Sequence, residues 1–260
     1  MGILNLTSDS FYDGGSFVDP AKALNHFDSM IHAGATIIDI GAESTRPGSR
    51  EVSVDKELSL LKPFFMAEER TSFARISVDT RKAKVASWAI AQGVHIINDV
   101  SALRYDSEMV RVIADSEISL VIMHSQGSPE TMQDNPQYDD PISDICDFIE
   151  ERLEYAQGFG IPLSRMIVDP GIGFGKTLDH NFTILRNLSI FKQWGCPLLL
   201  GASRKRFLAA VLDTAEADRL SGTLAVSAWA FEQGVDILRV HDVKETADVL
   251  QVLQAITQRK

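Results

Sequence analysis

Two groups of basic side chains follow the last two apolar runs of the sequence. The first is the segment 203–206, Ser-Arg-Lys-Arg, and the second consists of Arg239 and His241, two residues apart. Guanidinium, imidazole and ammonium groups together can hold an anion with two or three negative charges. Because the chain carries a net charge of −11 with histidine neutral, this concentration of cations indicates an anion site. The alternative for segment 203–206 taken alone is an ordinary solvated surface.

Two aspartates and one asparagine also follow apolar runs. They are Asp79, Asn98 and Asp169. A carboxylate accepts two parallel N–H donors from the guanidine-like edge of a heterocycle, and an amide beside it can both donate and accept. These side chains therefore predict a site for a flat, nitrogen-rich ring. The alternative is that the two carboxylates are structural partners in salt bridges.

The sequence shows no arrangement of histidine and cysteine that is typical of a zinc site. A Mg²⁺ ion bound to substrate phosphates needs only one or two oxygens from the protein. Asn5 and Asp13 could supply them.

The composition excludes several classes of protein. A net charge of −11 argues against a general nucleic-acid binder or membrane-surface binder, because both need a cationic face. No apolar run approaches the roughly 20 residues that span a bilayer. The two cysteines, Cys146 and Cys196, exclude a disulfide scaffold and favour a reducing compartment, so we expect a cytoplasmic protein.

Short runs of apolar, often β-branched residues alternate with helical patterns along the chain. The runs are continuous, as is typical of parallel strands covered on both faces. Amphipathic stretches such as 142–156 and 249–256 predict helices, and the apolar face of 249–256 is expected to pack on the strands. The eight expected strands are 2–6, 36–40, 75–78, 94–97, 119–123, 166–168, 197–200 and 236–240.

Eight strand–helix units at this length favour a single-domain (β/α)8 barrel, the α/β TIM-barrel fold, over residues 1–260. A doubly wound open sheet is the alternative. Several joins from strand to helix are long, and in such a barrel the chemistry lies on these loops. The polar residues at the strand ends therefore predict a ring of ligands at one mouth: Asn5, Asp39, Asp79, Asn98, Asp99, His124, Asp169, Ser203, Arg239 and His241.

Short segments in a fixed order carry a resemblance to a known family. They are MGILNLTSDSFYDGG at 1–15, GAESTRPG at 41–48, ISVDT at 76–80, INDVS at 97–101, DPGIGFGK at 169–176, GASRKRF at 201–207 and RVHDV at 239–243. Each is weak evidence alone, but together, in this order and spacing, they are highly specific. On these segments the chain closely resembles the dihydropteroate synthase family, of the pterin-binding barrel superfamily.

The resemblance implies a transferase of folate biosynthesis. The family joins p-aminobenzoate to 6-hydroxymethyl-7,8-dihydropterin diphosphate, releasing pyrophosphate and forming 7,8-dihydropteroate. It uses Mg²⁺, sulfonamides compete with p-aminobenzoate, and its members are commonly homodimers. These properties are expectations for this chain.

The resemblance also implies roles for individual residues. Those implied for the pterin are Asp79, Asn98, Asp169 and Lys205. The residues implied to bind the diphosphate are Arg239 and His241, and Val240 between them belongs to the same substrate site. The expected catalytic residues are Lys205, Arg239 and His241. Those implied for p-aminobenzoate are Thr45, Arg46, Pro47, Phe174 and Ser203, and those for Mg²⁺ are Asn5 and Asp13.

The residue types suit a dissociative reaction. If diphosphate leaves first, the dihydropterin shares positive charge with its methylene group, and the protein must stabilise the leaving group rather than supply a strong base. We expect the loops 7–19 and 41–54 to close over the site and exclude water. Two other functions remain open: a corrinoid-linked methyltetrahydrofolate methyltransferase, and a pterin-binding paralogue without catalytic activity.

Overall fold

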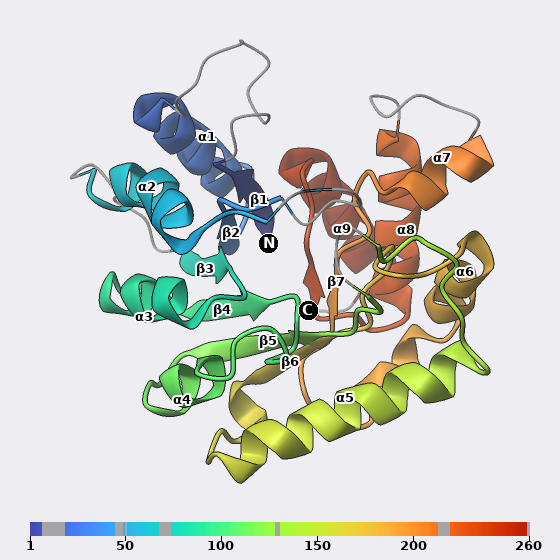
Figure 1. Cartoon of the computed structure of the whole chain (residues 1–260). Coiled ribbons are helices and arrows are strands. Elements are labelled where there is room, and N and C mark those ends of the chain that lie inside the picture. Colours follow the sequence, from blue (N-terminus) through green and yellow to red (C-terminus); the bar gives the residue numbers. More distant parts are fainter. Residues whose placement is uncertain are drawn as a thin grey trace.

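The computed structural model describes residues 1–6, 19–44, 49, 51–67, 74–127, 131–212 and 219–258. Eight strands run through this part of the chain in the expected order, each within two residues of its expected bounds (Figure 1). They are β1 (Gly2–Asn5), β2 (Ile37–Gly41), β3 (Arg75–Asp79), β4 (Ile96–Asp99), β5 (Ser119–Met123), β6 (Met166–Asp169), β7 (Leu199–Leu200) and β8 (Ile237–Leu238).

The strands form a closed circuit. β1 to β6 pair in sequence order as one parallel sheet, and β7 pairs with β8. Parallel bridges join Val168 to Leu198 and Gly2 to Val240, so both ends of the first sheet are tied to the second. The prediction of a (β/α)8 barrel is confirmed. The alternative of an open doubly wound sheet is wrong, because an open sheet would leave the β1 edge without a partner.

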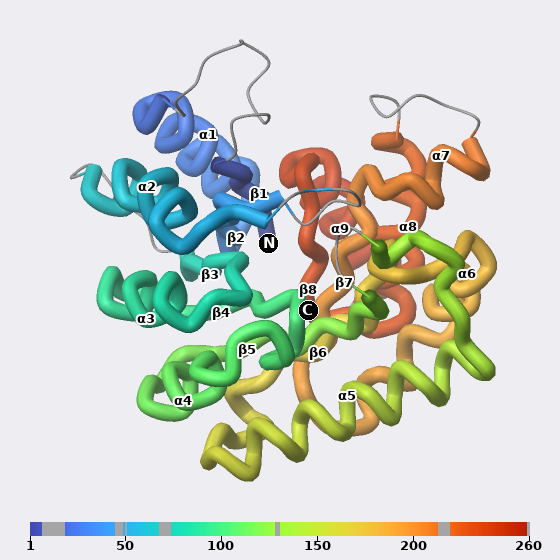
Figure 2. Tube along the Cα trace, in the orientation of Figure 1, coloured from blue at the N-terminus to red at the C-terminus, as the bar shows by residue number. Residues whose placement is uncertain are grey.

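The helices lie outside the strands and alternate with them (Figure 2). The α-helices of the described residues are α1 (Pro20–His32), α2 (Val54–Phe65), α3 (Ala83–Ala91), α4 (Met109–Ala114), α5 (Pro141–Gly158), α6 (Leu178–Arg186), α7 (Arg206–Leu212), α8 (Leu220–Glu232) and α9 (Val243–Thr257). Two short 3₁₀ turns, η1 (Leu163–Arg165) and η2 (Leu188–Lys192), precede β6 and β7.

Local sequence signals set where several helices begin and end. Asp19 caps α1, its carboxylate accepting the Ala21 N–H at 3.0 Å, and Pro20 occupies the first helical position. Gly93 follows the end of α3 with φ at +82°, a left-handed conformation that glycine adopts at little cost. These signals are local, because each depends on residues within a few positions of the helix end.

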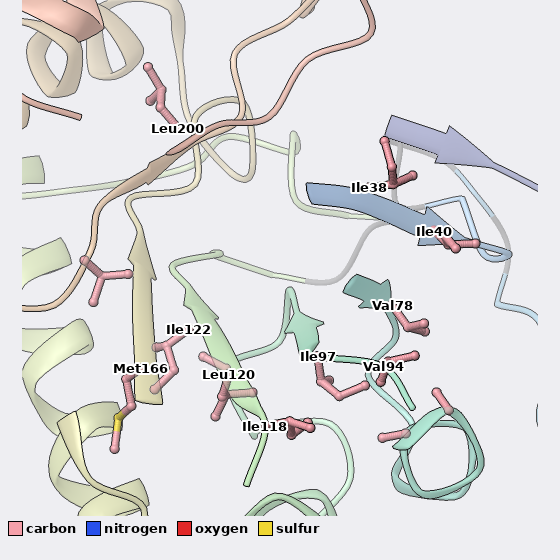
Figure 3. Close-up of a cluster of buried hydrophobic side chains, with 14 of the residues drawn as sticks. Ile38, Ile40, Val78, Val94, Ile97, Ile118, Leu120, Ile122, Met166 and Leu200 are labelled. Atoms are coloured by element: carbon pink, nitrogen blue, oxygen red, sulfur yellow. The ribbon is translucent and has the colours of Figure 1, made fainter. Parts of the chain in front are cut away.

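Two apolar cores lie on opposite sides of the strands. One face of each strand packs against the helices through residues such as Ile38, Ile97 and Ile122 (Figure 3). The other face points into the barrel, where the buried residues Ile96, Val121, Ile167 and Leu199 form a smaller cluster. Both cores are needed, since a strand of a closed barrel is covered on both faces.

The alternation of side chains along a strand carries the inner face to the barrel mouth. Asn98 lies two residues beyond Ile96, and Asp169 lies two residues beyond Ile167, so both polar side chains continue the inward-facing row. The fold therefore turns Asn98 and Asp169 toward the barrel axis. The predicted ring of ligands is wrong for Asp99 and His124, because side chains alternate along a strand: the Asp99 carboxylate accepts the Ser101 and Leu103 N–H groups, and the His124 ring packs on Phe148 of α5.

Helix α9 differs from the expectation. Its buried residues, Val243 and Thr246, lie in the first turns, while Val252 is 59% exposed and Ile256 is 70% exposed. Of the predicted apolar face of 249–256, Val249, Leu250 and Leu253 are half-buried, so the expectation that this face packs on the barrel is wrong only for the exposed Ile256. In the part of the chain that the structure describes, no helix has the length and apolar character needed to cross a membrane.

Candidate functional site

The centre of the site is a guanidinium held between two carboxylates. Arg239, just past β8, donates from Nε to Asp39 Oδ2 at 2.6 Å and from a terminal nitrogen to Asp79 Oδ2 at 3.1 Å. Asn98 Nδ2 donates to the same Asp39 oxygen at 3.0 Å. Side chains of β2, β3 and β4 are thus joined, inside the barrel, to the residue that follows β8.

Strand register explains why the two carboxylates lie at different depths. Asp39 pairs with Ser77 across β2 and β3, whereas Asp79 pairs with Gly41, two residues nearer the mouth. Asp39 is fully buried and Asp79 is 7% exposed. Asp39 therefore lies beneath the rim, and Asp79 lies at it.

Burial and charge act on these groups in opposite directions. Burial raises the pKa of the Asp79 carboxyl and the charge of Asp39 raises it further, while the Arg239 charge opposes both. Burial would lower the pKa of Arg239, but the charges of Asp39 and Asp79 outweigh it and the net shift is upward. Arg239 is therefore a permanent cation in a site that exposes little of it to water.

Asp169 and Lys205 form a second pair of opposite charges at the rim. Asp169 Oδ1 accepts the Gly171 N–H at 2.7 Å. Lys205 Nζ donates to Ile172 O and lies 4.4 Å from the centre of the Phe174 ring. Burial lowers the pKa of Lys205 to about 8, although the Asp169 charge opposes the shift. Burial also raises the pKa of Asp169, against the charge of Lys205.

Ser203 and His241 are neighbours, as their positions after β7 and β8 imply. Ser203 Oγ lies 3.1 Å from His241 Nδ1 and accepts the His241 backbone N–H at 3.2 Å. Val240 is buried, and its carbonyl accepts the Ile3 N–H at 3.0 Å. The predicted juxtaposition of the two basic segments is therefore present.

The basic segment 203–206 contributes one cation to the inner site rather than three. Arg204 makes a bidentate pair with Asp242, at 2.8 and 2.5 Å, and Arg206 is exposed at the start of α7. For Arg206 the alternative of a solvated surface is therefore correct, and Arg204 is neutralised by Asp242. The reason is that the loop enters a short helix, which spreads successive side chains around its axis.

A buried pair behind the rim was not predicted from the sequence. Lys176 Nζ lies 2.8 Å from His124 Nδ1 and donates to Phe174 O at 3.0 Å. Burial lowers the pKa of His124 to about 2, and the Lys176 charge adds to that effect, so the imidazole is neutral. A Cβ on Gly171 would overlap His124 O, which indicates how closely the two loops pack.

Asn5 ends β1 at the same rim. A Cβ built on Gly41 would lie 3.8 Å from Asn5 Oδ1 and 3.5 Å from the Cβ of Asp79. Among the described residues, no group of three or more His, Cys, Asp or Glu side chains could hold a metal by itself. The remaining predicted site residues, Asp13, Thr45, Arg46 and Pro47, lie outside the described residues.

Comparisons with known proteins identify the family. A family model described as pterin binding enzyme matches residues 1–241. Dihydropteroate synthase of Escherichia coli K12 is 42% identical over 260 residues, which cover 100% of this chain and 92% of that protein. The chain belongs to the dihydropteroate synthase family.

Solved structures of this family have the same fold. Dihydropteroate synthase of Yersinia pestis, in a sulfonamide drug complex, superposes with a TM-score of 0.93 at 40% identity, covering 99% of this chain and 93% of that one. The Clostridium difficile synthase, crystallised in the presence of pteroic acid, superposes with a TM-score of 0.92 at 40% identity, covering 99% of this chain and 96% of that one. The resemblance read from the sequence segments is confirmed.

The pKa of Lys205 is open to direct measurement. Competitive acetylation followed by mass spectrometry is expected to give a midpoint near pH 8 for this amine, because burial disfavours its charged form. In an Asp169→Asn variant the midpoint should move lower, since the Asp169 charge favours the ammonium. A wild-type midpoint near the ordinary lysine value of about 10.4 would contradict this description.

Proposed function

We propose that this chain is a transferase that joins p-aminobenzoate to 6-hydroxymethyl-7,8-dihydropterin diphosphate, giving 7,8-dihydropteroate and pyrophosphate. The observation that carries the proposal is the meeting of Arg239, Lys205 and His241 with Asp79 and Asp169 at one rim of the barrel. Family membership supports it. Pteroic acid, named for the Clostridium difficile synthase structure, joins a pterin to p-aminobenzoate.

The buried side chains of Asp169 and Asn98 suit the pterin. Asp169 is 6% exposed and Asn98 is 4% exposed, so a ring that reaches them leaves water. The Asn98 amide nitrogen already donates to Asp39, which leaves its carbonyl oxygen as an acceptor. Acceptors of this kind match the N–H groups of the pterin edge, with Asp79 and Lys205 completing the contacts.

The cations suit the leaving group. When the bond between the methylene carbon and the diphosphate oxygen breaks, both electrons leave with pyrophosphate, and positive charge remains on the dihydropterin. Arg239 and His241 stabilise the anion, while Asp79 and Asp169 favour the cation. In a site that excludes water these interactions are stronger than in solution.

The arylamine attacks the methylene carbon and then loses a proton. Phe174 and Ser203 would lie around p-aminobenzoate together with Thr45, Arg46 and Pro47. Closure of the loops 7–19 and 41–54 over the bound substrates stays a prediction.

A Mg²⁺ ion fits this rim on chemical grounds. The half-buried Asn5 offers a neutral amide oxygen beside Asp79, and a diphosphate supplies most of the oxygen ligands that Mg²⁺ requires. Asn5 would hold the ion, with Asp13 as the second proposed ligand. When bound, the ion would neutralise negative charge on the diphosphate.

Two further properties are proposed from the family. The exposed Val252 and Ile256 of α9 would lie in the contact of a homodimer, and sulfonamides would inhibit by competing with p-aminobenzoate. Cys146 and Cys196 are both free thiols, in keeping with the proposed cytoplasmic location.

The proposed function is tested by measuring pyrophosphate release from the pterin diphosphate. Release is expected only when p-aminobenzoate and Mg²⁺ are both present, and a sulfonamide should raise the apparent KM for p-aminobenzoate without changing kcat. A paralogue without catalytic activity would bind the pterin and release no pyrophosphate. Methyl transfer from methyltetrahydrofolate would indicate the corrinoid-linked enzyme instead.

If His241 contacts the diphosphate, its loss should weaken binding of the pterin diphosphate but not of a pterin that lacks the diphosphate. His241→Ala should raise the Kd for the pterin diphosphate about tenfold or more, the cost of one charge-assisted hydrogen bond. Binding of 6-hydroxymethylpterin, which lacks the diphosphate, should be unchanged in calorimetry. Asp169→Asn is the matched comparison and should weaken both ligands alike. Equal losses for both ligands in His241→Ala would show that the residue does not contact the diphosphate.

A further inference from the structure

The turn between β7 and α7 contains a residue in an unusual backbone conformation. Arg204 has a φ of +55°, in the left-handed region that favours glycine. The Lys205 N–H donates to Ala202 O at 3.4 Å, which makes Arg204 the third residue of the turn. A residue with a side chain keeps this conformation only where surrounding contacts hold it, and such positions concentrate at functional sites.

The backbone of Arg204 is held by the start of α8. Its N–H donates to Thr223 Oγ1 at 3.0 Å, and its carbonyl accepts an N–H of the Arg219 guanidinium at 2.9 Å. Thr223 Oγ1 donates in turn to Arg219 O at 2.9 Å. Both partners are buried, so these hydrogen bonds lie in a region of low dielectric. The turn is therefore fixed through its backbone, while the Arg204 side chain reaches a different element.

That element is the start of α9. The Arg204 guanidinium donates to both oxygens of Asp242, at 2.8 and 2.5 Å, and the Asp242 side chain is 12% exposed. Asp242 is the cap residue of α9, where an aspartate usually accepts an N–H from the first turn, yet its carboxylate makes no such bond to the described helix. Asp242 therefore gives up a local contact in favour of one with the loop after β7.

Both partners of this ion pair adjoin residues of the anion site. Asp242 directly follows His241, and Arg204 directly follows Ser203. Ser203 Oγ lies 3.1 Å from His241 Nδ1 and accepts the His241 backbone N–H at 3.2 Å. The loops after β7 and β8 are thus joined by two adjacent contacts, and the position of His241 depends on both.

We propose that Arg204 and Asp242 are positioning residues for His241. Their ion pair holds the start of α9 against the left-handed turn, and this keeps the His241 imidazole beside Ser203. The inference rests on the proposed function, in which His241 binds the diphosphate. The pair acts through His241 and contacts no substrate itself.

The side chains proposed for the pterin are held by other contacts. Lys205 Nζ donates to Ile172 O, and Asp169 Oδ1 accepts the Gly171 N–H at 2.7 Å. The turn that carries Lys205 also keeps its hydrogen bonds to α8 when Asp242 is replaced. Loss of the ion pair should therefore affect the diphosphate much more than the pterin.

Replacing Asp242 separates a role in position from a role in charge. By Coulomb attraction alone, loss of a carboxylate beside an anion site should strengthen the binding of a diphosphate. Loss of a positioning contact should weaken it instead, so the two roles predict opposite changes in Kd. Asp242→Ser suits this comparison, because serine is a favoured cap residue and Glu245 lies three positions later, in the pattern of a capping box.

The experiment measures Kd values by calorimetry, without p-aminobenzoate, for wild type, Asp242→Ser, His241→Ala and the double variant. Asp242→Ser should raise the Kd for the pterin diphosphate about threefold to tenfold and leave that for 6-hydroxymethylpterin within about twofold. In the His241→Ala background, Asp242→Ser should raise the Kd no further, because the residue that it positions is absent.

Asp248→Ser is the matched control. It removes a carboxylate from the same helix, where Asp248 forms an exposed pair with Lys244. Because this pair makes no contact with the loop after β7 among the described residues, both Kd values should stay within about twofold of wild type.

Three results would overturn the inference. They are an unchanged or lower Kd for the pterin diphosphate in Asp242→Ser, an equal loss of both ligands, and a further rise in the His241→Ala background. If Asp242→Ser does not fold, Asp242→Asn decides in its place, with a rise in the same Kd expected.

Inorganic pyrophosphate is the second probe, and its Kd should rise in Asp242→Ser by a similar factor. Its binding requires no turnover, so this comparison stays valid even if wild type releases no pyrophosphate from the pterin diphosphate. That second result would contradict the proposed function, whereas an unchanged Kd for pyrophosphate in Asp242→Ser would contradict the role of the ion pair.

Discussion

The site depends on two ion pairs that share the half-buried Arg239, which is held by Asp39 below and Asp79 above. Inside the barrel little water screens these charges, so each carboxylate fixes the guanidinium far more firmly than a surface pair would. Asn98, which binds the same Asp39 oxygen, takes its orientation from the same interaction. The placement of the anion-binding cation and of a pterin-binding amide thus has a common origin.

Barrel closure makes this interaction possible. Asp39 and Arg239 are 200 residues apart, and they meet because the bridge between Gly2 and Val240 places the end of β8 beside β1. The alternation along each strand then sends the last polar residue inward, above an apolar layer that includes Ile96 and Ile167. The lower layer is apolar and stabilises the fold, and the upper layer is polar and carries the chemistry.

The sequence predicts what is local or periodic. Continuous apolar runs predict the strands, and the polar residues after them predict the rim. How deep a side chain lies in the barrel depends on strand register, which the sequence does not show. In the sequence, Asp39 and Asp79 both end an apolar run, so their different depths could not be predicted. Contacts between distant residues are equally hidden: Arg204 pairs with Asp242, 38 positions away, and Lys82 pairs with Glu43, 39 positions away.

The most direct test of the central ion pair is a double-mutant cycle that combines Arg239→Gln with Asp39→Asn. The Kd of the pterin diphosphate would be measured for wild type, both single variants and the double variant. If Asp39 acts by holding Arg239, its substitution should weaken binding in wild type but add little to Arg239→Gln, giving a coupling energy of about 1 kcal/mol or more. The account would be contradicted if the binding free energies lost in the two single variants summed, to within about 0.5 kcal/mol, to the loss in the double variant.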